Sequence, residues 1–403
     1  MRRLRTQVAV IGAGPAGLFL ANVLGQGGVD CVVVERESRE QVEQRARAGL
    51  LEHRVVELLR AHGLAERLVA EGTRHGWCDF RCAGRTVRVD YGAASGGYRH
   101  WVYPQQFLVR DLVAALENVG RTPLFGQRAL RIDGLASDRP RVVCDGVEIE
   151  CDYVVGCDGS QGVSRAALAS VPRPFVSCQY PYNWLAVLAE VDRPAEGVLY
   201  TINSAGFAAM MPRTRHVSRF YLQCSPRDSQ QDWPEERVRQ TLESRLGEGP
   251  EGDRDRIPTL GRVLERNVLT MRSSVARSFG HGRLLLAGDA AHLLTPAGAK
   301  GMNLAIADAA YLGRALVAAC RDGDRYELDG YTDRRLPDAR RAQGFSDWLL
   351  QLLHLSQDEV PDAARALSAR LATIDGLARP GAQAAAFAHR YVGSPERLAA
   401  DAG

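Results

Sequence analysis

Three glycines near the start of the chain have the spacing of a phosphate-binding turn. Gly12, Gly14 and Gly17 form the pattern G-x-G-x-x-G between a strand-like run, QVAVI, and a helical run. In such a turn the first glycine permits the tight bend, the second lets a pyrophosphate approach the backbone, and the third lets helix and strand pack closely. The helix that follows offers unpaired N–H groups to the phosphates. A glycine pattern alone could be an ordinary turn, but its flanking strand and helix favour dinucleotide binding.

An acidic residue closes the next strand-like run and extends this pattern. Glu35 ends the run CVVVE, about 20 residues beyond the glycines, where this type of fold places the acid that bonds a ribose. A carboxylate there favours a free 2′-hydroxyl, as in FAD or NAD, over a 2′-phosphate. The glycines and Glu35 together predict a site for the adenosine half of a dinucleotide.

A second acid stands far along the chain in a similar setting. Asp289 follows the apolar run RLLLAG and precedes the glycine-rich segment AAHLLTPAGAKG, after which an alanine-rich helical run begins. Alone, this aspartate could simply cap a helix. Beside the first motif it is better explained by one long cofactor. Its carboxylate can accept a hydrogen bond from a ribityl hydroxyl, and a helix N-terminus can stabilise the negative charge of a reduced flavin. We therefore predict FAD.

The elements that must position these residues alternate between strand and helix. The predicted fold class is α/β: a Rossmann-like FAD-binding domain with the GxGxxG turn, a sheet-rich substrate domain and a helical C-terminal region. The expected elements are a strand–turn–helix–strand unit over 7–35, helices over 50–72 and 104–120, short strands over 128–155, a sheet over 176–270 with a helix EERVRQTLESRL inside it, and helices over 304–392.

These elements suggest three segments of the chain. We expect residues 1–175 to form the first part of the FAD-binding domain and 176–275 the substrate-binding sheet domain. Residues 276–403 would return to the FAD-binding domain and add a helical interface region.

The 403-residue chain has the composition of an ordinary globular protein, with 45% hydrophobic and 25% charged residues and a formal net charge of +3. Its acids and bases are interspersed, which argues against nucleic acid or a membrane as partner. The nine cysteines show no zinc-type pair of Cys-x2-Cys motifs, so we expect small buried residues in a reducing cytoplasm and no metal site. Glycines interrupt the apolar run at the N-terminus, which we interpret as structure and not as a targeting segment.

Three segments together resemble the flavoprotein aromatic hydroxylases, or class A FAD monooxygenases. They are VIGAGPAGL, YVVGCDGSQGVSR and LLLAGDAAHLLTPAGAKGMNLAIADA, and the likeness extends through RARAGLLEH to the terminal RYVGSPE. Within this class the chain is most similar to the 4-hydroxybenzoate 3-monooxygenase family. The resemblance implies an FAD-dependent enzyme that hydroxylates an aromatic acid ortho to a phenol or amine through a flavin hydroperoxide. NADH or NADPH would be the reductant and O2 the co-substrate, and the enzyme would be a homodimer.

The resemblance assigns several residues to the cofactor. Arg47 and Gln105 would hold the pyrophosphate and ribose region of FAD, and Asp158 would lie between FAD and the path of the nicotinamide. Asp289 would bond the ribityl chain. Two further residues would lie against the isoalloxazine ring: Gly298 and Asn303.

Other residues are assigned by the resemblance to the substrate and its proton. Arg213 and Tyr221 would hold a carboxylate, for which an arginine fork is well suited. Tyr200 and Tyr391 would form a relay that ionises the phenol, and His75 would pass the proton to solvent. Such a relay moves a proton without burying a permanent charge.

Each of these residues also has a plainer interpretation. Arg213 lies in an arginine-rich run and could be a solvated strand residue. His75 could be a surface or satisfied histidine, and Tyr391 a packing aromatic. The fit of Arg213 with Tyr200 and Tyr221 favours the substrate site.

The chain departs from the family pattern around the expected substrate. Met211 stands where the family has a serine that helps to bind the carboxylate, and Ala209 where a larger residue is usual. Thr295 replaces a proline before Pro296, whose carbonyl would face the para group of the substrate. The reshaped pocket makes a substituted relative plausible beside 4-hydroxybenzoate, such as 3-amino-4-hydroxybenzoate or 3,4-dihydroxybenzoate. If position 3 is occupied, hydroxylation would move to another ortho carbon.

The segment expected to contact the reductant also departs from that pattern. It keeps Arg36 but has Glu37 and Gln41 where NADPH-selective members carry an amide and a tyrosine. Because an acid repels a 2′-phosphate, we expect NADH use or little discrimination.

Two other functions compete with hydroxylation. A flavin dehydrogenase or reductase would never insert oxygen, and a non-catalytic flavin-binding protein could sense aromatic acids. The pair of Tyr200 and Tyr391 disfavours the first, and the intact relay together with Asp289 disfavours the second.

Overall fold

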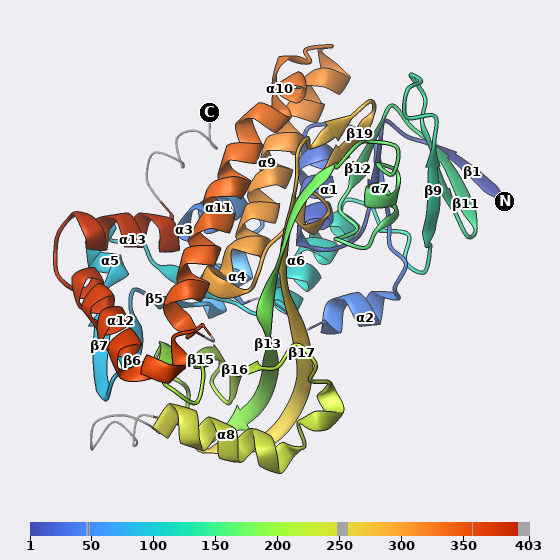
Figure 1. Ribbon diagram of the computed structural model, residues 1–403. Helices are drawn as coiled ribbons and strands as arrows, with labels where there is room; N and C mark the ends of the chain where they lie inside the picture. Colours follow the sequence, from blue (N-terminus) through green and yellow to red (C-terminus); the bar gives the residue numbers. More distant parts are fainter. Residues whose placement is uncertain (46, 48, 248–256, 357, 394–403) are drawn as a thin grey trace.

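Two long strands tie the molecule together. In this computed structural model, which describes residues 1–45, 47, 49–247, 257–356 and 358–393, β13 (Phe175–Val191) and β17 (Leu260–Ala276) pair antiparallel along most of their length. Figure 1 shows them running from the part that holds α1 (Pro15–Gln26) to the part that holds α8 (Glu235–Gly247). They connect a region of parallel strands and helices to a region of antiparallel sheet.

The parallel region is a five-stranded sheet that carries the glycine turn. Its order is β18-β19-β12-β2-β3, and the strands from β19 to β3 run parallel. The bounds are β2 (Val8–Ile11), β3 (Cys31–Val34), β12 (Tyr153–Gly156), β18 (Gly280–His281) and β19 (Leu284–Leu286). All residues of β2, β12 and β19 are buried, as expected for parallel strands that are covered on both faces.

Helix α1 brings the two cofactor motifs together. It begins with Pro15, whose missing N–H is no loss at the first position of a helix, and Ala16–Leu24 are buried. The helix packs on α6 (Gln105–Asn118) and on α9 (Lys300–Arg321). Because α9 follows the segment of Asp289, this packing places the late motif near the glycine turn.

The antiparallel region is an eight-stranded sheet with the order β20-β17-β13-β16-β15-β14-β6-β7. Its other strands are β6 (Cys78–Cys82), β7 (Arg85–Val89), β14 (Val198–Ile202), β15 (Ala208–Thr214), β16 (Val217–Cys224) and β20 (His292–Leu293). The early strands β6 and β7 therefore complete a sheet built mostly from later segments. The division of the chain at 175 and 275 stays a prediction, although β13 begins and β17 ends close to these positions.

Two smaller sheets complete the β-structure of the described residues. One has the order β1-β11-β10-β9, and the other β4-β8-β5. Their strands are β1 (Arg2–Arg5), β9 (Ala129–Asp133), β10 (Arg141–Cys144), β11 (Val147–Glu150), β4 (Leu50–Leu51), β5 (Thr73–His75) and β8 (His100–Val102).

The prediction of one helix over 50–72 is wrong. The segment forms β4 and then two helices, α3 (His53–Ala61) and α4 (Glu66–Glu71). Gly63 lies between the helices with φ of +69°. A glycine in this left-handed conformation ends a helix, so the apolar spacing continues while the helix does not.

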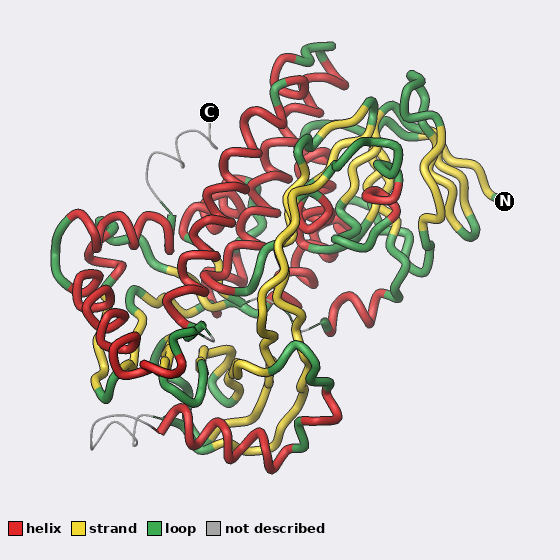
Figure 2. The backbone as a smooth tube through the Cα atoms, in the orientation of Figure 1, coloured by secondary structure: helices red, strands yellow, loops and turns green. Residues whose placement is uncertain are grey.

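The C-terminal part is helical, as predicted. After α9 come α10 (Tyr326–Asp329), α11 (Tyr331–Leu353), α12 (Ala363–Ala378) and α13 (Ala382–Val392), and short helices elsewhere are α2 (Arg39–Gln44), α5 (Tyr91–Ala94) and α7 (Val163–Ala166). Figure 2 shows α9 and α11 as long helices that lie side by side. With the two sheet regions, these helices confirm the predicted fold class.

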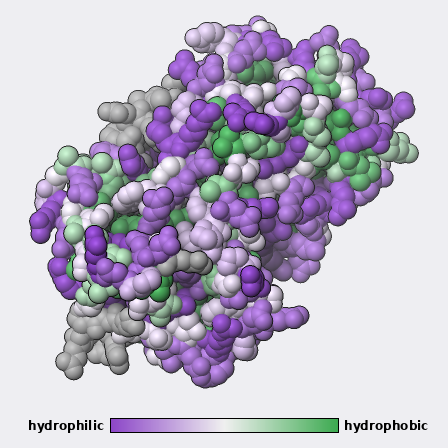
Figure 3. Space-filling view, viewed as in Figure 1, coloured by the Kyte–Doolittle hydropathy of each residue, from purple (hydrophilic) through white to green (hydrophobic). Residues whose placement is uncertain are grey.

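One helical stretch in the described part of the chain is long and apolar enough to cross a membrane. It spans Ala297–Arg321, but 72% of its apolar window is buried inside the protein. We therefore assign it to the core. On the face shown in Figure 3, hydrophilic residues predominate and hydrophobic residues form small patches.

Candidate active site

A cleft of about 1440 Å³ opens at the carboxyl ends of the parallel strands and continues over the antiparallel sheet. Gly12 and Glu35, which follow β2 and β3, line one end, and Arg213 and Tyr221 of the eight-stranded sheet line the other. Open α/β sheets bind ligands at this edge. The volume, and the lining residues drawn from both sheets, suit a dinucleotide with a small molecule beside it.

The three glycines of the turn have three different surroundings. Gly12 has φ of +105°, and a Cβ built on it would lie 2.4 Å from the carbonyl oxygen of Cys157. A Cβ on Gly17 would lie 2.0 Å from the carbonyl oxygen of Gly12, so helix and turn are in close contact there. Gly14 lies at the N-terminus of α1, and a Cβ added to it would have no neighbour within 4 Å. It therefore leaves the open space that a pyrophosphate needs.

Glu35 is held at the cleft by backbone groups. Its Oε2 accepts a hydrogen bond of 2.8 Å from the N–H of Ala13, and its Oε1 accepts one of 3.0 Å from the N–H of Glu37. Arg36 also lines the cleft and donates from Nε to Glu37 at 3.1 Å. The predicted ribose acid therefore lies beside the glycine turn, at the end of β3.

Arg47 lies between the two cofactor motifs. Although its side chain is exposed at the cleft, the surrounding protein partly desolvates the guanidinium and lowers its pKa; Arg45 also lowers it, whereas the charges of Asp289 and Glu35 oppose this. Arg47 and Gln105 both line the cleft. An arginine in this position can pair with phosphate oxygens.

Asp158 lies at the end of a parallel strand and lines the cleft. It follows β12, and its Oδ2 accepts a hydrogen bond of 2.9 Å from the N–H of Ser164. Its Oδ1 is buried and has no hydrogen-bond partner among the described residues. Burial raises the pKa of this carboxyl group. Because an unsatisfied buried oxygen is unfavourable, by about 1–3 kcal/mol, this atom fits a ligand hydroxyl or amide in the cleft.

The late motif lines the middle of the cleft. Asp289 lies in a single 3-10 turn, Gly288–Ala290, and not at the start of α9, so it is not that helix's cap. Arg165 fixes this turn by donating to the carbonyl of Asp289 at 3.0 Å. Thr295 and Pro296 line the cleft beyond it, and the Pro296 carbonyl accepts from Ala299 at 3.1 Å.

Gly298 and Asn303 are sequence neighbours of residues that line the cleft, but they do not line it themselves. The Asn303 amide is fully engaged: its Oδ1 accepts from the N–H of Glu52 at 2.7 Å, and its Nδ2 donates to the carbonyls of Leu50 and Ala299. Asn303 therefore joins β4 to α9. Contact of Gly298 or Asn303 with the flavin ring stays a prediction.

Arg213 is a buried cation that faces the cleft. Its side chain is only 7% exposed, and Nη2 donates to Oε1 of Gln106 at 3.4 Å. Burial, and to a smaller extent the neighbouring Arg219, lower the pKa of Arg213 to about 10. The guanidinium lies over Gly49, where a Cβ would meet Nη1 at 2.0 Å. Arg213 is therefore no solvated strand residue, and a carboxylate would relieve the repulsion between the two arginines.

The remaining predicted substrate residues form a row across the sheet. Tyr200 of β14 pairs with Ala209 of β15, which pairs with Tyr221 of β16. Two residues after Ala209 on β15, Met211 pairs with Arg219 of β16 and lines the cleft. The small Ala209 thus separates the two tyrosines; it is fully buried and is not among the residues that line the cleft.

Tyr200 and Tyr391 are brought together by the fold. Their hydroxyl groups lie 2.9 Å apart, and each residue is 1% exposed. Burial raises the pKa of both hydroxyls. His75 is also buried, but no hydrogen bond between described residues joins it to Tyr391.

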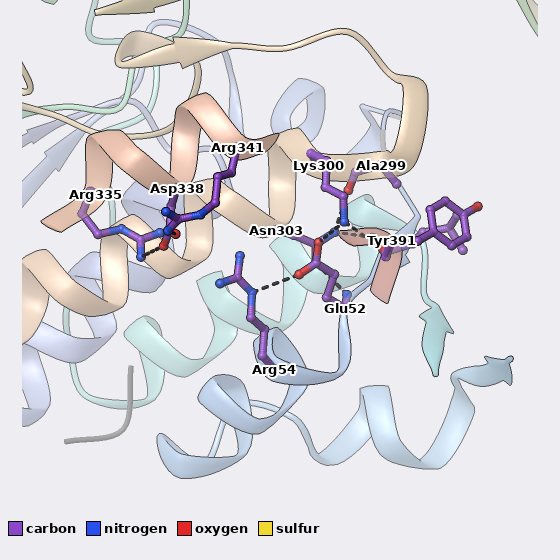
Figure 4. A network of polar contacts seen from close by, with 10 residues as sticks. Glu52, Arg54, Ala299, Lys300, Asn303, Arg335, Asp338, Arg341 and Tyr391 are labelled. Atoms are coloured by element: carbon purple, nitrogen blue, oxygen red, sulfur yellow. Dashed lines mark hydrogen bonds and ion pairs between the residues drawn. The ribbon is translucent and has the colours of Figure 1, made fainter. Parts of the chain in front are cut away.

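A buried charged cluster, whose Lys300 also lines the cleft, was not predicted (Figure 4). Lys300 donates to Oε1 of Glu52 at 2.7 Å and to the backbone carbonyl of Tyr391 at 2.8 Å, and Arg54 donates to Oε2 of Glu52 at 2.9 Å. Although burial alone raises the pKa of Glu52, Lys300 and Arg54 together lower it to about 2. The one signal in the sequence was an acid and a base within apolar, glycine-rich surroundings, LLEHR and AGAKG.

The chain is similar to known flavin-dependent hydroxylases. Residues 5–346 match the profile of the family described as FAD binding domain. The chain is 34% identical to p-hydroxybenzoate hydroxylase of Acinetobacter baylyi, with 99% of this chain and 98% of that protein covered. It is 28% identical to 12-dehydrotetracycline 5-monooxygenase/anhydrotetracycline 6-monooxygenase of Streptomyces rimosus, covering 92% and 77%.

Solved structures agree with this similarity. Anhydrotetracycline hydroxylase from Streptomyces rimosus has a TM-score of 0.75 at 27% identity, with 96% of this chain and 76% of that chain covered. For p-nitrophenol 4-monooxygenase from Pseudomonas putida DLL-E4 the TM-score is 0.81 at 21% identity, with 99% of both chains covered, which shows a shared fold. The chain belongs to the FAD-dependent aromatic hydroxylases, the monooxygenases that use FAD, NAD(P)H and O2 on small aromatic substrates.

Proposed function

We propose that this enzyme hydroxylates a 4-hydroxybenzoate or a 3-substituted relative, such as 3-amino-4-hydroxybenzoate or 3,4-dihydroxybenzoate, ortho to the phenol or amine. The observation that carries the proposal is that Arg213 of β15 is a buried arginine facing the cleft, and that the neighbouring strand β14 holds Tyr200, whose hydroxyl is hydrogen-bonded to that of Tyr391 on α13. A substrate with an acid at one end of a ring and an ionisable hydroxyl at the other matches both. Tyr221 of β16 lies across Ala209 from Tyr200, lines the cleft with Arg213 and can add a hydroxyl to the carboxylate contact.

The residues at this end of the cleft orient the ring and move its proton. Arg213 fixes the carboxylate, which sets the angle of the ring to the cofactor. The Tyr200 hydroxyl accepts the phenol proton while Tyr391 takes the proton that Tyr200 gives up, so that electron density reaches the ortho carbon. FAD, when bound, supplies the oxygen chemistry. Glu35, Arg47, Asp158 and Asp289 would hold it in the extended cleft.

The small side chain of Ala209, at a position where the family has a larger residue, supports a substituent on the ring. Ala209 is flanked by Tyr200 and Tyr221 on the neighbouring strands and fills less volume between them than a larger residue would. Met211 offers no hydroxyl to the carboxylate, so binding of the carboxylate depends on Arg213 and Tyr221. Both features favour a 3-substituted substrate over plain 4-hydroxybenzoate.

The experiment that tests this function is a substrate screen. Purified enzyme with FAD is given 4-hydroxybenzoate, its 3-amino and 3-hydroxy derivatives and 4-aminobenzoate, and nicotinamide oxidation, oxygen uptake and products are measured. We expect ring hydroxylation with one O2 taken up per hydroxyl formed. Nicotinamide oxidation without a hydroxylated product would indicate a dehydrogenase or reductase. No substrate-stimulated oxidation would indicate a sensor of aromatic acids.

The reductant is proposed to be NADH, or either nicotinamide without strong preference. Arg36 is paired with Glu37 at 3.1 Å, so its charge is already balanced at the place where a 2′-phosphate would need it. Oxidation rates of NADH and NADPH at equal concentration test this, and strict preference for NADPH would contradict it. A homodimer in the cytoplasm is part of the same proposal, and size-exclusion chromatography with light scattering tests the dimer.

A further inference from the structure

The direction of the Asp289 carboxylate depends on a very short turn. Asp289 is half-buried, lines the cleft and makes no hydrogen bond through its side chain to another described residue. Its carboxylate is therefore aimed by the backbone of the single 3-10 turn Gly288–Ala290. Because so short a turn lacks the repeated hydrogen bonds of an α-helix, other parts of the core must hold it in place.

A buried carboxylate on α9 holds this turn at both ends. Oδ2 of Asp308 accepts a hydrogen bond of 3.3 Å from the N–H of Gly288, directly before Asp289. The same oxygen accepts a hydrogen bond from Nε2 of His292, just beyond the end of the turn. Asp308 and His292 are both fully buried. One oxygen atom thus ties together two groups that flank the turn.

The contact with Asp308 depends on a close approach of backbone to helix. Gly288 has φ of +59°, and a Cβ built on it would lie 3.1 Å from the Cβ of Ala305 on α9. Ala305 and Asp308 are three residues apart and therefore neighbours on one face of the helix. A glycine at this position lets the N–H reach the carboxylate.

Arg335 of α11 balances the charge of Asp308. It donates from Nε to Oδ1 of Asp308 at 3.0 Å and from Nη1 to Oδ2 of Asp338 at 2.9 Å, the contact drawn in Figure 4. Although burial raises the pKa of Asp308, His292 and Arg335 together hold it below its usual value. The carboxyl group is therefore ionised and both of its oxygens accept, so that Nε2 of His292 carries a hydrogen.

Arg165 holds the remaining polar groups of the turn. Its Nη2 donates to the backbone carbonyl of Asp289 at 3.0 Å, and its Nε donates to that of Ala290 at 2.9 Å. Arg165 thus binds carbonyls of the turn, whereas Asp308 binds the first N–H. With its backbone fixed in this way, Asp289 presents its carboxylate to the cleft in one direction.

We propose that Asp308 and His292 position Asp289 for the ribityl chain of FAD, a role that rests on the contact between Asp289 and that chain in the proposed function. Neither residue lines the cleft, so both act through the backbone of the turn. A carboxylate that is already in place loses little conformational freedom when its ligand binds. The clamp made by Asp308, Gly288 and His292 therefore strengthens binding of the flavin half of the cofactor.

The test compares binding of FAD and of ADP to the apoprotein of a His292→Ala variant. ADP has the adenosine and pyrophosphate part, which suits the glycine turn and Glu35, but it lacks the ribityl chain. We expect FAD to bind at least about tenfold more weakly, as the loss of groups that orient metal ligands weakens metal binding by about 10–100-fold. Fluorescence titration measures FAD affinity, and calorimetry should show unchanged affinity for ADP.

Two further variants change the same clamp. In His292→Gln the amide nitrogen can take the place of Nε2 and donate to Asp308, so this conservative variant should restore most of the FAD affinity. Asp308→Asn should weaken FAD binding as His292→Ala does, because an amide turns one accepting oxygen into a donor. Thermal unfolding shows which variants fold. If Asp308→Asn does not, the comparison of His292→Ala with His292→Gln decides.

The matched control is Tyr331→Phe. The buried Tyr331 of α11 donates from its hydroxyl to the backbone carbonyl of Leu286 at 2.8 Å. Its replacement removes one buried hydrogen bond from the same core and leaves the contacts of Asp308 and His292 in place. This variant should unfold at a lower temperature and bind FAD as before.

Three results would overturn the role of the clamp. The first is unchanged FAD affinity in folded His292→Ala. The second is an equal loss of FAD and ADP binding, or an equal loss of FAD binding in Tyr331→Phe, because the whole core is then loosened. The third is full FAD affinity in Asp289→Asn, since Asp289 then does not hold the ribityl chain. These titrations contain no benzoate, so failure here is distinct from failure of the proposed hydroxylation, which the substrate screen measures.

Discussion

The two ends of the cleft are built in different ways. The cofactor end is local: Gly12, Gly14, Gly17 and Glu35 lie within one strand–turn–helix–strand unit. Its contacts are made largely by backbone groups, such as the N–H of Ala13 that binds Glu35. The substrate end is assembled from distant segments: Tyr200 and Tyr391 are separated by 191 residues and meet at 2.9 Å.

This difference teaches how each end is specified. A backbone turn depends on the space that a residue leaves empty, so one added methyl group can disrupt the turn or block its ligand. A side-chain site depends on which residues neighbouring strands place opposite one another, as Ala209 lies between Tyr200 and Tyr221. Cofactor binding should therefore be lost through backbone clashes, and substrate binding through loss of single side-chain groups.

The strongest test of the cofactor end compares Gly17→Ala with Gly14→Ala. The Cβ of Gly17→Ala would meet the Gly12 carbonyl oxygen at 2.0 Å, so we expect loss of FAD binding and destabilisation of about 3 kcal/mol or more. Gly14→Ala has open space around its Cβ. It should keep the unfolding temperature of the apoprotein yet weaken FAD binding at least about tenfold, because the methyl group occupies the path of the pyrophosphate. Thermal unfolding and FAD fluorescence titration measure both. Equal behaviour of the two variants would contradict the different roles of the glycines.

The next largest effect tests the substrate end. Arg213→Ala removes the buried cation and should weaken binding of every benzoate by about 2–5 kcal/mol, at least about 30-fold. FAD affinity should not change, because Arg213 lies at the opposite end of the cleft from the glycine turn. Ligand titration by flavin absorbance measures the substrate affinity.

Its control is Arg215→Ala, two residues further along in an exposed turn. That variant should bind benzoates as before. Undiminished affinity in Arg213→Ala would show that the carboxylate binds elsewhere.

A third prediction concerns the buried charged cluster around Glu52. Glu52→Gln leaves Lys300 and Arg54 with a neutral partner and should lower the free energy of unfolding at pH 7 by about 3 kcal/mol. The pKa of Glu52 is about 2 in the folded protein, against 4.5 for an ordinary glutamate. Its depressed pKa means that this stabilisation is complete above about pH 4.5 and is lost as the pH falls toward 2. Denaturant unfolding of both proteins between pH 7 and pH 4 measures the difference, which should begin to shrink near pH 4.5.

The half-buried Glu57, paired with Arg60 on α3, provides the comparison. Glu57→Gln should change stability by no more than about 0.5 kcal/mol, since partly exposed ion pairs contribute little. A pH-independent loss in Glu52→Gln would mean that the carboxylate acts through its shape and not through its charge.

The smallest expected effect lies at the rim of the cofactor end. Glu37→Gln removes the charge that balances Arg36 and should raise activity with NADPH relative to NADH by about three- to tenfold, because a partly exposed pair is worth about 1 kcal/mol. Steady-state kinetics with both reductants measure the ratio. Glu43→Gln, which alters the pair of Glu43 with Arg39 on α2, should leave the ratio unchanged. A ratio that stays constant in Glu37→Gln would assign the choice of reductant to other residues.

The sequence by itself determined the cofactor end and the fold class. Residues Gly12, Gly14, Gly17 and Glu35 are close in the chain, and their roles follow from local geometry that a fixed spacing imposes. Apolar spacing also predicted α1, α6 and the helical C-terminal part. It failed over 50–72, where Gly63 in a left-handed conformation divides the helix, because apolar periodicity does not report the backbone angles of one residue.

Tertiary structure alone decided the substrate end. Arg213, Tyr200 and Tyr391 could be named through a resemblance, but their meeting depends on strand register and on the docking of α13, which no local pattern encodes. The structure also paired Glu52 with Lys300, to which the sequence motifs around them had assigned no role. The physical reason is that a spacing rule fixes contacts within one turn or hairpin, whereas contacts between distant segments follow from how the whole core packs.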